Sequence, residues 1–191
     1  MTSDRPSAEA LLKQAAAIYD ADPELRRAAR AVAREGAGFT GGGRWMALAL
    51  GKLRGVAAPT PEIPWERWGF FKYGLCTLAC APVLALCVAT GQWAWALLMV
   101  VAFYAIEAQM VFLFPVLLDQ APEPLSRARE HTVRAGGTWR VMRTVWVLAA
   151  VMIFGGLAGR GFVRSWCLGC LAVAIWYELI HGRGAWQTDR R

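Results

Sequence analysis

Charged residues are scarce in this chain of 191 residues, at 18% of the sequence, whereas hydrophobic residues make up 57%. A soluble domain is typically about one quarter charged and about half apolar. The charges are also segregated, because 11 of the 21 lysine and arginine residues precede residue 73 and the rest of the chain consists of long apolar runs with short charged links. This composition favours a helical membrane protein over a soluble domain.

The chain also lacks the motifs of several common enzyme classes. It has no phosphate-binding glycine loop, no H-E-x-x-H motif and no serine nucleophile elbow. The net charge of +7 is not accompanied by a basic patch interleaved with aromatic residues, so we expect no nucleic-acid partner. Residues 1–35 do not have the basic start and apolar core of a secretory signal, and we expect them to stay in the cytoplasm.

Residues 1–36 are predicted to form a cytoplasmic amphipathic helical hairpin. Apolar residues recur at helical spacing over 7–20, and Asp22, Pro23 and Gly36 are typical of the start and end of a second helix. The apolar stripe of the second helix is rich in alanine and therefore buries little area. The hairpin consequently needs the membrane surface, a partner or the remainder of the protein to pack against.

Residues 37–69 are predicted to connect this hairpin to the membrane. A glycine-rich stretch at 39–43 predicts a flexible joint, and residues 45–56 predict a short interfacial helix with basic flanks. Three prolines between residues 57 and 65 predict an extended linker.

Residues 70–182 predict an all-α, polytopic membrane helix bundle of four spans. The spans are expected at 70–90, 93–118, 144–159 and 162–181, followed by a basic tail at 183–191. The last two are short against the ~20 residues that usually cross a bilayer. A re-entrant hairpin over 144–181 is therefore the main alternative for this part of the chain.

The distribution of basic residues predicts the orientation. Lysine and arginine gather in the N-terminal region, in the link between the second and third spans and in the tail, whereas the turn at Gly91 carries none. The positive-inside rule places those three basic regions in the cytoplasm, which requires an even number of spans. Abundant alanine and arginine with few lysines indicate a GC-rich bacterium. The expected location is therefore a bacterial inner (plasma) membrane, with both termini cytoplasmic.

Glu107 is the only charged residue in the second predicted span, and it lies one helical turn from Tyr104 on the same face. A carboxylate inside a membrane is costly unless it is neutral, paired or hydrated. Glu107 therefore predicts either a functional group, such as a proton relay, metal ligand or substrate contact, or a structural hydrogen bond between helices.

Glu178 and His181 have the Glu-x-x-His spacing that recurs in di-iron carboxylate bundles. A full site of that kind needs two such pairs and two further glutamates, and the sequence has one pair. The candidate metal ligands are Glu107, Glu130, His131, Glu178 and His181, and the candidate catalytic residues are Glu107, Tyr104, Glu178 and His181. The structural alternative is a Glu/His pair that ends a helix, where histidine suits the helix dipole.

Five arginines in the link before the third span are candidates for binding lipid phosphates or a partner protein: Arg127, Arg129, Arg134, Arg140 and Arg143. The alternative is ordinary positive-inside charge. Cys167 and Cys170 form a C-x-x-C pair, which performs thiol–disulfide exchange when exposed and electropositive. A quinone-linked thiol oxidase also needs a second cysteine pair in an outer loop, and the outer turns contain none, which favours small buried side chains instead.

Three functions fit these observations. The leading hypothesis is an accessory or structural membrane subunit, without an identifiable reaction or cofactor, that engages membrane lipids and another membrane protein or a second copy of itself. The first alternative is a membrane-embedded enzyme, with or without a metal, that acts on a lipid or quinone at the cytoplasmic face. The second is a small proton-coupled carrier that uses Glu107.

Overall fold

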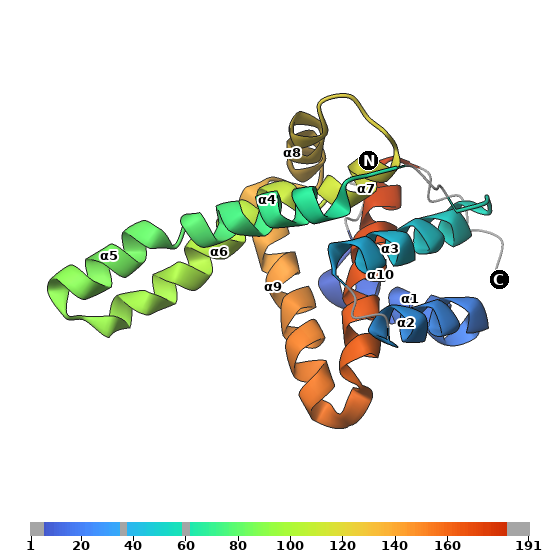
Figure 1. The fold of residues 1–191 in the computed structure, drawn as a ribbon, viewed down its shortest axis with the longest axis horizontal. Helices are drawn as coiled ribbons and strands as arrows, with labels where there is room; N and C mark the ends of the chain where they lie inside the picture. The colour runs from blue at the N-terminus through green and yellow to red at the C-terminus, as the bar shows by residue number, and fades with distance from the viewer. Residues whose placement is uncertain (1–5, 35–37, 59–61, 183–191) are drawn as a thin grey trace.

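Helices make up all the regular secondary structure in residues 6–34, 38–58 and 62–182, which are the residues that this computed structural model describes (Figure 1). The all-α prediction is therefore confirmed for this part of the chain. The helices in chain order are α1 (Ala8–Ala21), α2 (Pro23–Arg34), α3 (Phe39–Arg54), α4 (Trp65–Leu78), α5 (Ala81–Thr90), η1 (Trp93–Ala96), α6 (Leu97–Met110), α7 (Leu113–Leu118), α8 (Pro124–Arg134), α9 (Thr138–Gly155), η2 (Gly156–Arg160) and α10 (Phe162–Ile180). The predicted tail at 183–191, the predicted helix end at Gly36 and the centre of the predicted linker lie outside the described residues.

Four helical stretches are long and apolar enough to cross a membrane: Trp65–Thr90, Trp93–Leu118, Thr138–Gly159 and Phe162–Ile180. The third begins at Thr138 instead of residue 144, because Gly137 adopts a positive φ of 85° and the helix starts directly after it. Arg140 and Arg143 consequently belong to α9 and not to the preceding link.

The apolar helices form two hairpins that share a base and then project in different directions (Figure 1). In the first hairpin, α4 and α5 run outward and α6 returns, with Gly91 at a φ of 66° in the turn. In the second hairpin, α9 and α10 lie antiparallel. The two hairpins meet where α6 packs on α9, and there Gln109 donates a hydrogen bond of 2.5 Å to the Thr138 hydroxyl. The two hairpins therefore diverge instead of aligning along one bundle axis.

The body of the protein is built around α10. Helices α1, α2, α3 and α9 all pack against α10. The apolar face of α1, with Leu11, Ala15 and Tyr19, belongs to the same buried cluster as Leu171 and Ile175 of α10. The N-terminal hairpin was expected to pack against the membrane surface, a partner or the remainder of the protein. In the structure it packs against the remainder of the protein.

The glycine-rich stretch at 39–43 is not the flexible joint that the sequence predicts. It lies inside α3, and a Cβ atom at Gly43 would sit 2.3 Å from the ring of Trp65. A Cβ atom at Gly69 of α4 would likewise sit 2.1 Å from the ring of Phe39. These glycines let α3 and α4 approach closely. The segment 45–56, predicted as an interfacial helix, belongs largely to α3, and Trp45 is buried in the core of the body.

Candidate functional site

Glu107 forms a buried ion pair at the base of the first hairpin. Its carboxylate Oε1 lies 2.8 Å from Nζ of Lys72, which extends from α4 and is 3% exposed. The thiol of Cys76 lies 3.8 Å from the second carboxylate oxygen. The ammonium group is also 5.3 Å from the ring centre of Tyr73 and 5.1 Å from that of Phe114. The pair compensates its own charges, and removal of one partner would leave the other charge buried.

A cavity of about 160 Å³ adjoins this ion pair, between α4, α6, α9 and α10. Its lining is mostly apolar and includes Tyr104 and Cys170 beside Lys72 and Glu107. The ring of Tyr104 packs edge-on against Trp146, with 6.3 Å between the ring centres. Tyr104 and Glu107 therefore share one site, as their spacing indicates. An apolar cavity of roughly 150 Å³ accommodates a molecule the size of benzene.

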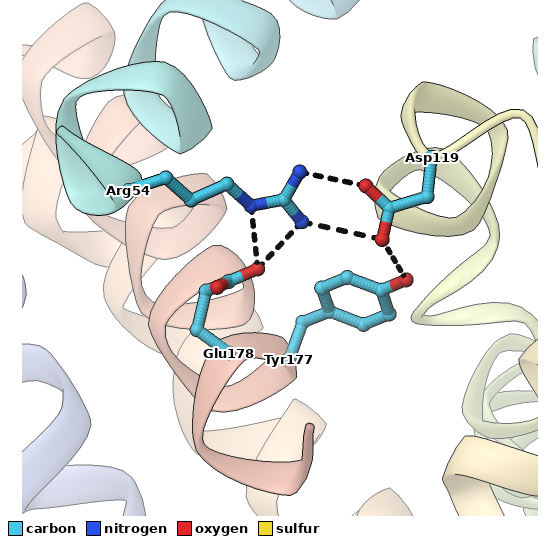
Figure 2. Close-up of polar contacts among 4 residues, drawn as sticks. All are labelled: Arg54, Asp119, Tyr177 and Glu178. Atoms are coloured by element: carbon cyan, nitrogen blue, oxygen red, sulfur yellow. Dashed lines mark hydrogen bonds and ion pairs between the residues drawn. The ribbon is translucent and has the colours of Figure 1, made fainter. Parts of the chain in front are cut away.

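A second polar site joins α3, α7 and α10 at the base of the two hairpins (Figure 2). The guanidinium group of Arg54 donates to Glu178 Oε1 from Nε at 3.0 Å and from Nη2 at 2.6 Å. The same group donates to Asp119 at 2.7 Å and 3.2 Å, and the Tyr177 hydroxyl donates to Asp119 at 2.8 Å. Burial disfavours the charged form of Arg54, but the hydrogen bonds to Glu178 and Asp119 outweigh it and raise its pKa. The network is a charge-assisted link between three segments that are distant in sequence.

The two histidines lie together next to this network. The rings of His131 and His181 are 4.4 Å apart between centres, and the ring of Tyr177 is 5.0 Å from His131. Burial, reinforced by the neighbouring His181 and Arg134, lowers the pKa of His131 to about 4. His131 is therefore neutral at pH 7. Its Nδ1 atom is buried without a hydrogen-bond partner among the described residues.

The five candidate metal ligands do not converge. Glu107 pairs with a lysine, Glu130 pairs with two arginines of its own helix, and Glu178 pairs with an arginine of α3. Only His131 and His181 lie side by side. Within the described ranges, no group of three or more histidine, cysteine, aspartate or glutamate side chains is arranged to hold a metal ion.

The candidate lipid-binding arginines are exposed on α8 and at the start of α9: Arg127, Arg129, Arg134, Arg140 and Arg143. Glu130 neutralises part of this charge through ion pairs of 2.9 Å with Arg127 and 2.5 Å with Arg134. Arg140 and Arg143 line a groove of about 820 Å³ together with Ser7, the residue that caps the start of α1. The cluster therefore divides into a partly compensated half on α8 and a groove-lining half on α9.

Cys167 and Cys170 are both free thiols on α10. Cys167 is fully buried in the core, so it lacks the access that thiol–disulfide exchange requires. Cys170 lines the cavity beside the Lys72–Glu107 pair. The two cysteines thus belong to different surroundings, although they lie one turn apart.

No known protein family, curated protein or solved structure matches this chain.

Sequence reasoning missed Lys72, Arg54 and Asp119. Lys72 and Glu107 bound the uncharged stretch of the sequence, and an antiparallel hairpin folded at Gly91 brings its two ends together, so this pair had a recognisable signal. Arg54 and Asp119 had none, because they are separated by 65 residues and meet only through the tertiary fold.

Proposed function

We propose that this protein is a membrane-anchored accessory protein without a reaction of its own, which engages lipids or partner proteins at its cytoplasmic face. The α4–α6 hairpin is the anchor. The observation that carries this proposal is its exposed apolar surface, since only 11% of the most apolar 18-residue window in Trp65–Thr90 is buried. Large apolar side chains stand exposed along both arms: Phe70, Leu78, Val88, Trp93, Leu97 and Val100. An uncovered apolar surface of this extent is typical of a membrane or protein contact.

The length of the hairpin supports the same proposal. No charged residue lies between Lys72 and Glu107, and each arm of this stretch extends for about 25 Å at a helical rise of 1.5 Å per residue. The hydrocarbon core of a bilayer is about 30 Å thick. The Lys72–Glu107 pair then lies near one boundary of the hydrocarbon, and Trp93 and Trp95 lie near the other, where aromatic residues are favoured.

The charge distribution supports a cytoplasmic base. The exposed arginines of α2, α8 and α9 all lie at the base end of the hairpin, and the Gly91 end carries no charge. Under the positive-inside rule, the N-terminal helices and the C-terminal end of α10 face the cytoplasm of a bacterial plasma membrane.

Two sets of charge-neutralising substitutions test the accessory role. In Arg129→Gln/Arg140→Gln/Arg143→Gln, three exposed arginines of α8 and α9 are neutralised; in the matched control Arg27→Gln/Arg30→Gln/Arg34→Gln, the same number of exposed arginines is neutralised on α2. We expect native mass spectrometry of wild-type protein from mild detergent to show a bound anionic phospholipid or a second polypeptide of fixed stoichiometry. The first variant should lose this species, and the control should keep it. A strictly monomeric, lipid-free wild-type particle would contradict the proposal.

The cavity beside Lys72 and Glu107 favours a second candidate function, an enzyme or carrier site for the ring of a quinone or a similar headgroup. Ala149 lines this cavity, whereas the adjacent Ala150 is exposed on the outside of α9. If the cavity holds such a ring, lipid extracts of the purified protein should contain it, Ala149→Phe should remove it, and Ala150→Phe should not. Extracts without any ring-bearing lipid would eliminate this candidate. The ion pair between Lys72 and Glu107 argues against the proton-coupled carrier, because Lys72 already neutralises Glu107.

A further inference from the structure

Helix α1 accompanies the α9–α10 hairpin along its length. At one end, Asp20 pairs with Arg164 near the start of α10, with 2.7 Å between Oδ2 and Nη2. At the other end, Ser7 lines a groove with Arg140 and Arg143 near the start of α9. Since α9 and α10 are antiparallel, α1 reaches from the base of this hairpin to its tip.

The outward faces of α1 and α2 are built for water. Charged side chains stand exposed on them: Glu9, Lys13, Asp20, Glu24, Arg27, Arg30 and Arg34. If α10 crossed the bilayer, α1 would have to cross beside it and would carry Glu9, Lys13 and Asp20 into or through the hydrocarbon. Charged groups are not stable there without partners. The packing of α1 on α10 therefore places α10 on the same side of the membrane as the N-terminal helices.

The exposed face of α9 has the opposite character. Four large apolar side chains are exposed on it: Trp139, Val147, Ile153 and Phe154. Leu157 of η2, which follows α9 directly, is exposed as well. Leu148 and Val141, which α9 directs into the core, are buried. In Figure 1, α9 lies between α10 and the side toward which the α4–α6 hairpin projects. The apolar surface of α9 thus continues the apolar surface of the anchor.

We propose that only the α4–α6 hairpin crosses the bilayer, and that α9 lies along the cytoplasmic leaflet with its exposed face in contact with anionic lipids. This inference rests on the anchoring role proposed for the α4–α6 hairpin. Ile153, Phe154 and Leu157 enter the boundary between headgroups and acyl chains, as in other interfacial helices. Arg140 and Arg143, at the start of α9, face the lipid phosphates, whose charge they complement. In this arrangement α10 is the central helix of a body outside the bilayer, in place of a fourth span.

Accessibility to a membrane-impermeant maleimide tests the topology. Ala158→Cys places a thiol at the tip of the α9–α10 hairpin, Ala17→Cys places one on the water face of α1, and Gln92→Cys places one at the tip of the anchor; all three positions are exposed. The reagent is applied to right-side-out and to inverted membrane vesicles, and unsubstituted protein gives the background of the five native cysteines.

We expect Ala158→Cys to react from the side that labels Ala17→Cys, and Gln92→Cys to react from the other side. Labelling of Ala158→Cys from the Gln92 side would establish four spans, and labelling from neither side would place the tip within hydrocarbon; either result overturns the inference. Labelling of Gln92→Cys from the Ala17 side would instead refute the anchor, and with it the proposed function.

Spin labels test the lipid contact of α9 directly. A nitroxide is attached at Phe154→Cys or, as control, at Ala17→Cys, in protein reconstituted into vesicles of phosphatidylcholine and phosphatidylglycerol. We expect the label at Phe154 to collide with oxygen and to be shielded from a water-soluble nickel complex, with the reverse at Ala17. Equal access of the nickel complex to both labels would show that α9 does not lie in the lipid.

Discussion

The Trp65–Thr90 segment and the Phe162–Ile180 segment are both apolar enough to cross a membrane, yet they differ in how much of each is buried within the protein. Only 11% of the most apolar window of the first is buried within the protein, against 61% of the second. The first extends away from the body, whereas α1, α2, α3 and α9 surround the second. A helix that is apolar on all sides is either a membrane span or a buried core helix. Hydropathy therefore shows that a helix is unstable in water, whereas packing shows whether lipid or the rest of the protein surrounds it.

The largest effect is expected at the base of the anchor, where it is packed like a protein core. Lys72→Met should lower the free energy of unfolding by about 3–5 kcal/mol, because it leaves the carboxylate of Glu107 buried without its partner. Thermal unfolding in detergent measures the loss. The double variant Lys72→Met/Glu107→Leu should recover most of it, and Arg67→Met, an exposed position on the same helix, should have little effect. A double variant as unstable as the single one would show that the charges are not the cause.

A matched pair of truncations compares the two regions directly. Leu171 in α10 is fully buried, whereas Leu97 in α6 is 76% exposed. We expect Leu171→Ala to lower the free energy of unfolding by about 2–5 kcal/mol, since it opens a cavity in the core. Leu97→Ala should change it by less than about 0.5 kcal/mol. Equal losses in detergent-solubilised protein would show that the anchor is packed against protein as tightly as α10.

The pair of His131 on α8 and His181 at the end of α10 predicts that the stability of the body depends on pH. Burial, with His181 and Arg134 nearby, lowers the pKa of His131 to about 4 in the folded protein, against about 6.5 in the unfolded chain. The unfolded state therefore binds more protons between these values, and stability should fall as the pH drops from about 6.5 to 4, by up to about 3 kcal/mol. Chemical unfolding at a series of pH values measures this slope, which should diminish in His131→Phe. The same slope in both proteins would assign the effect to other groups, such as His181.

The smallest effect discriminates between water and lipid around the second hairpin. The Asp20–Arg164 pair is partly exposed on both sides, and an ion pair in water contributes about 0–1 kcal/mol. A double-mutant cycle with Asp20→Asn and Arg164→Gln should give a coupling within this range that declines as salt is added. A coupling of several kcal/mol that salt does not affect would place the pair in hydrocarbon. The α9–α10 hairpin would then cross the membrane as the α4–α6 hairpin does.

Much of the helical architecture was predictable from local patterns. Asp22 caps α2 through a hydrogen bond of 2.8 Å from the Glu24 amide, as its position before Pro23 indicates. The turn at Gly91 and the pairing of Glu107 with a structural partner were also within reach of the sequence. The prediction of a flexible joint from the glycines at 41–43 was wrong, because glycine occurs both in flexible joints and where two helices approach closely. Only the contact between the ring of Trp65 and Gly43 decides between these two roles.

The candidate sites were less accessible to sequence reasoning. Tyr104 and Glu107 lie together because helical spacing alone brings them to one face. Glu178 and His181 share such a spacing, yet Arg54 takes up the glutamate while the histidine packs on His131. Helical periodicity predicts which side chains of one helix lie side by side, whereas partners from other segments depend on the tertiary packing of the chain.

By itself, the sequence determined that this protein is helical, that it has four stretches apolar enough for a membrane and that its basic residues favour one side. These properties follow from composition and periodicity, which act over a few turns of helix. The tertiary structure decided which apolar stretch remains uncovered and which becomes a core, because that depends on whether α1 and α3 fold back over it. It also brought Arg54 to Asp119 and Glu178, which no local pattern specifies, since the energy of such a network arises only when the three segments meet.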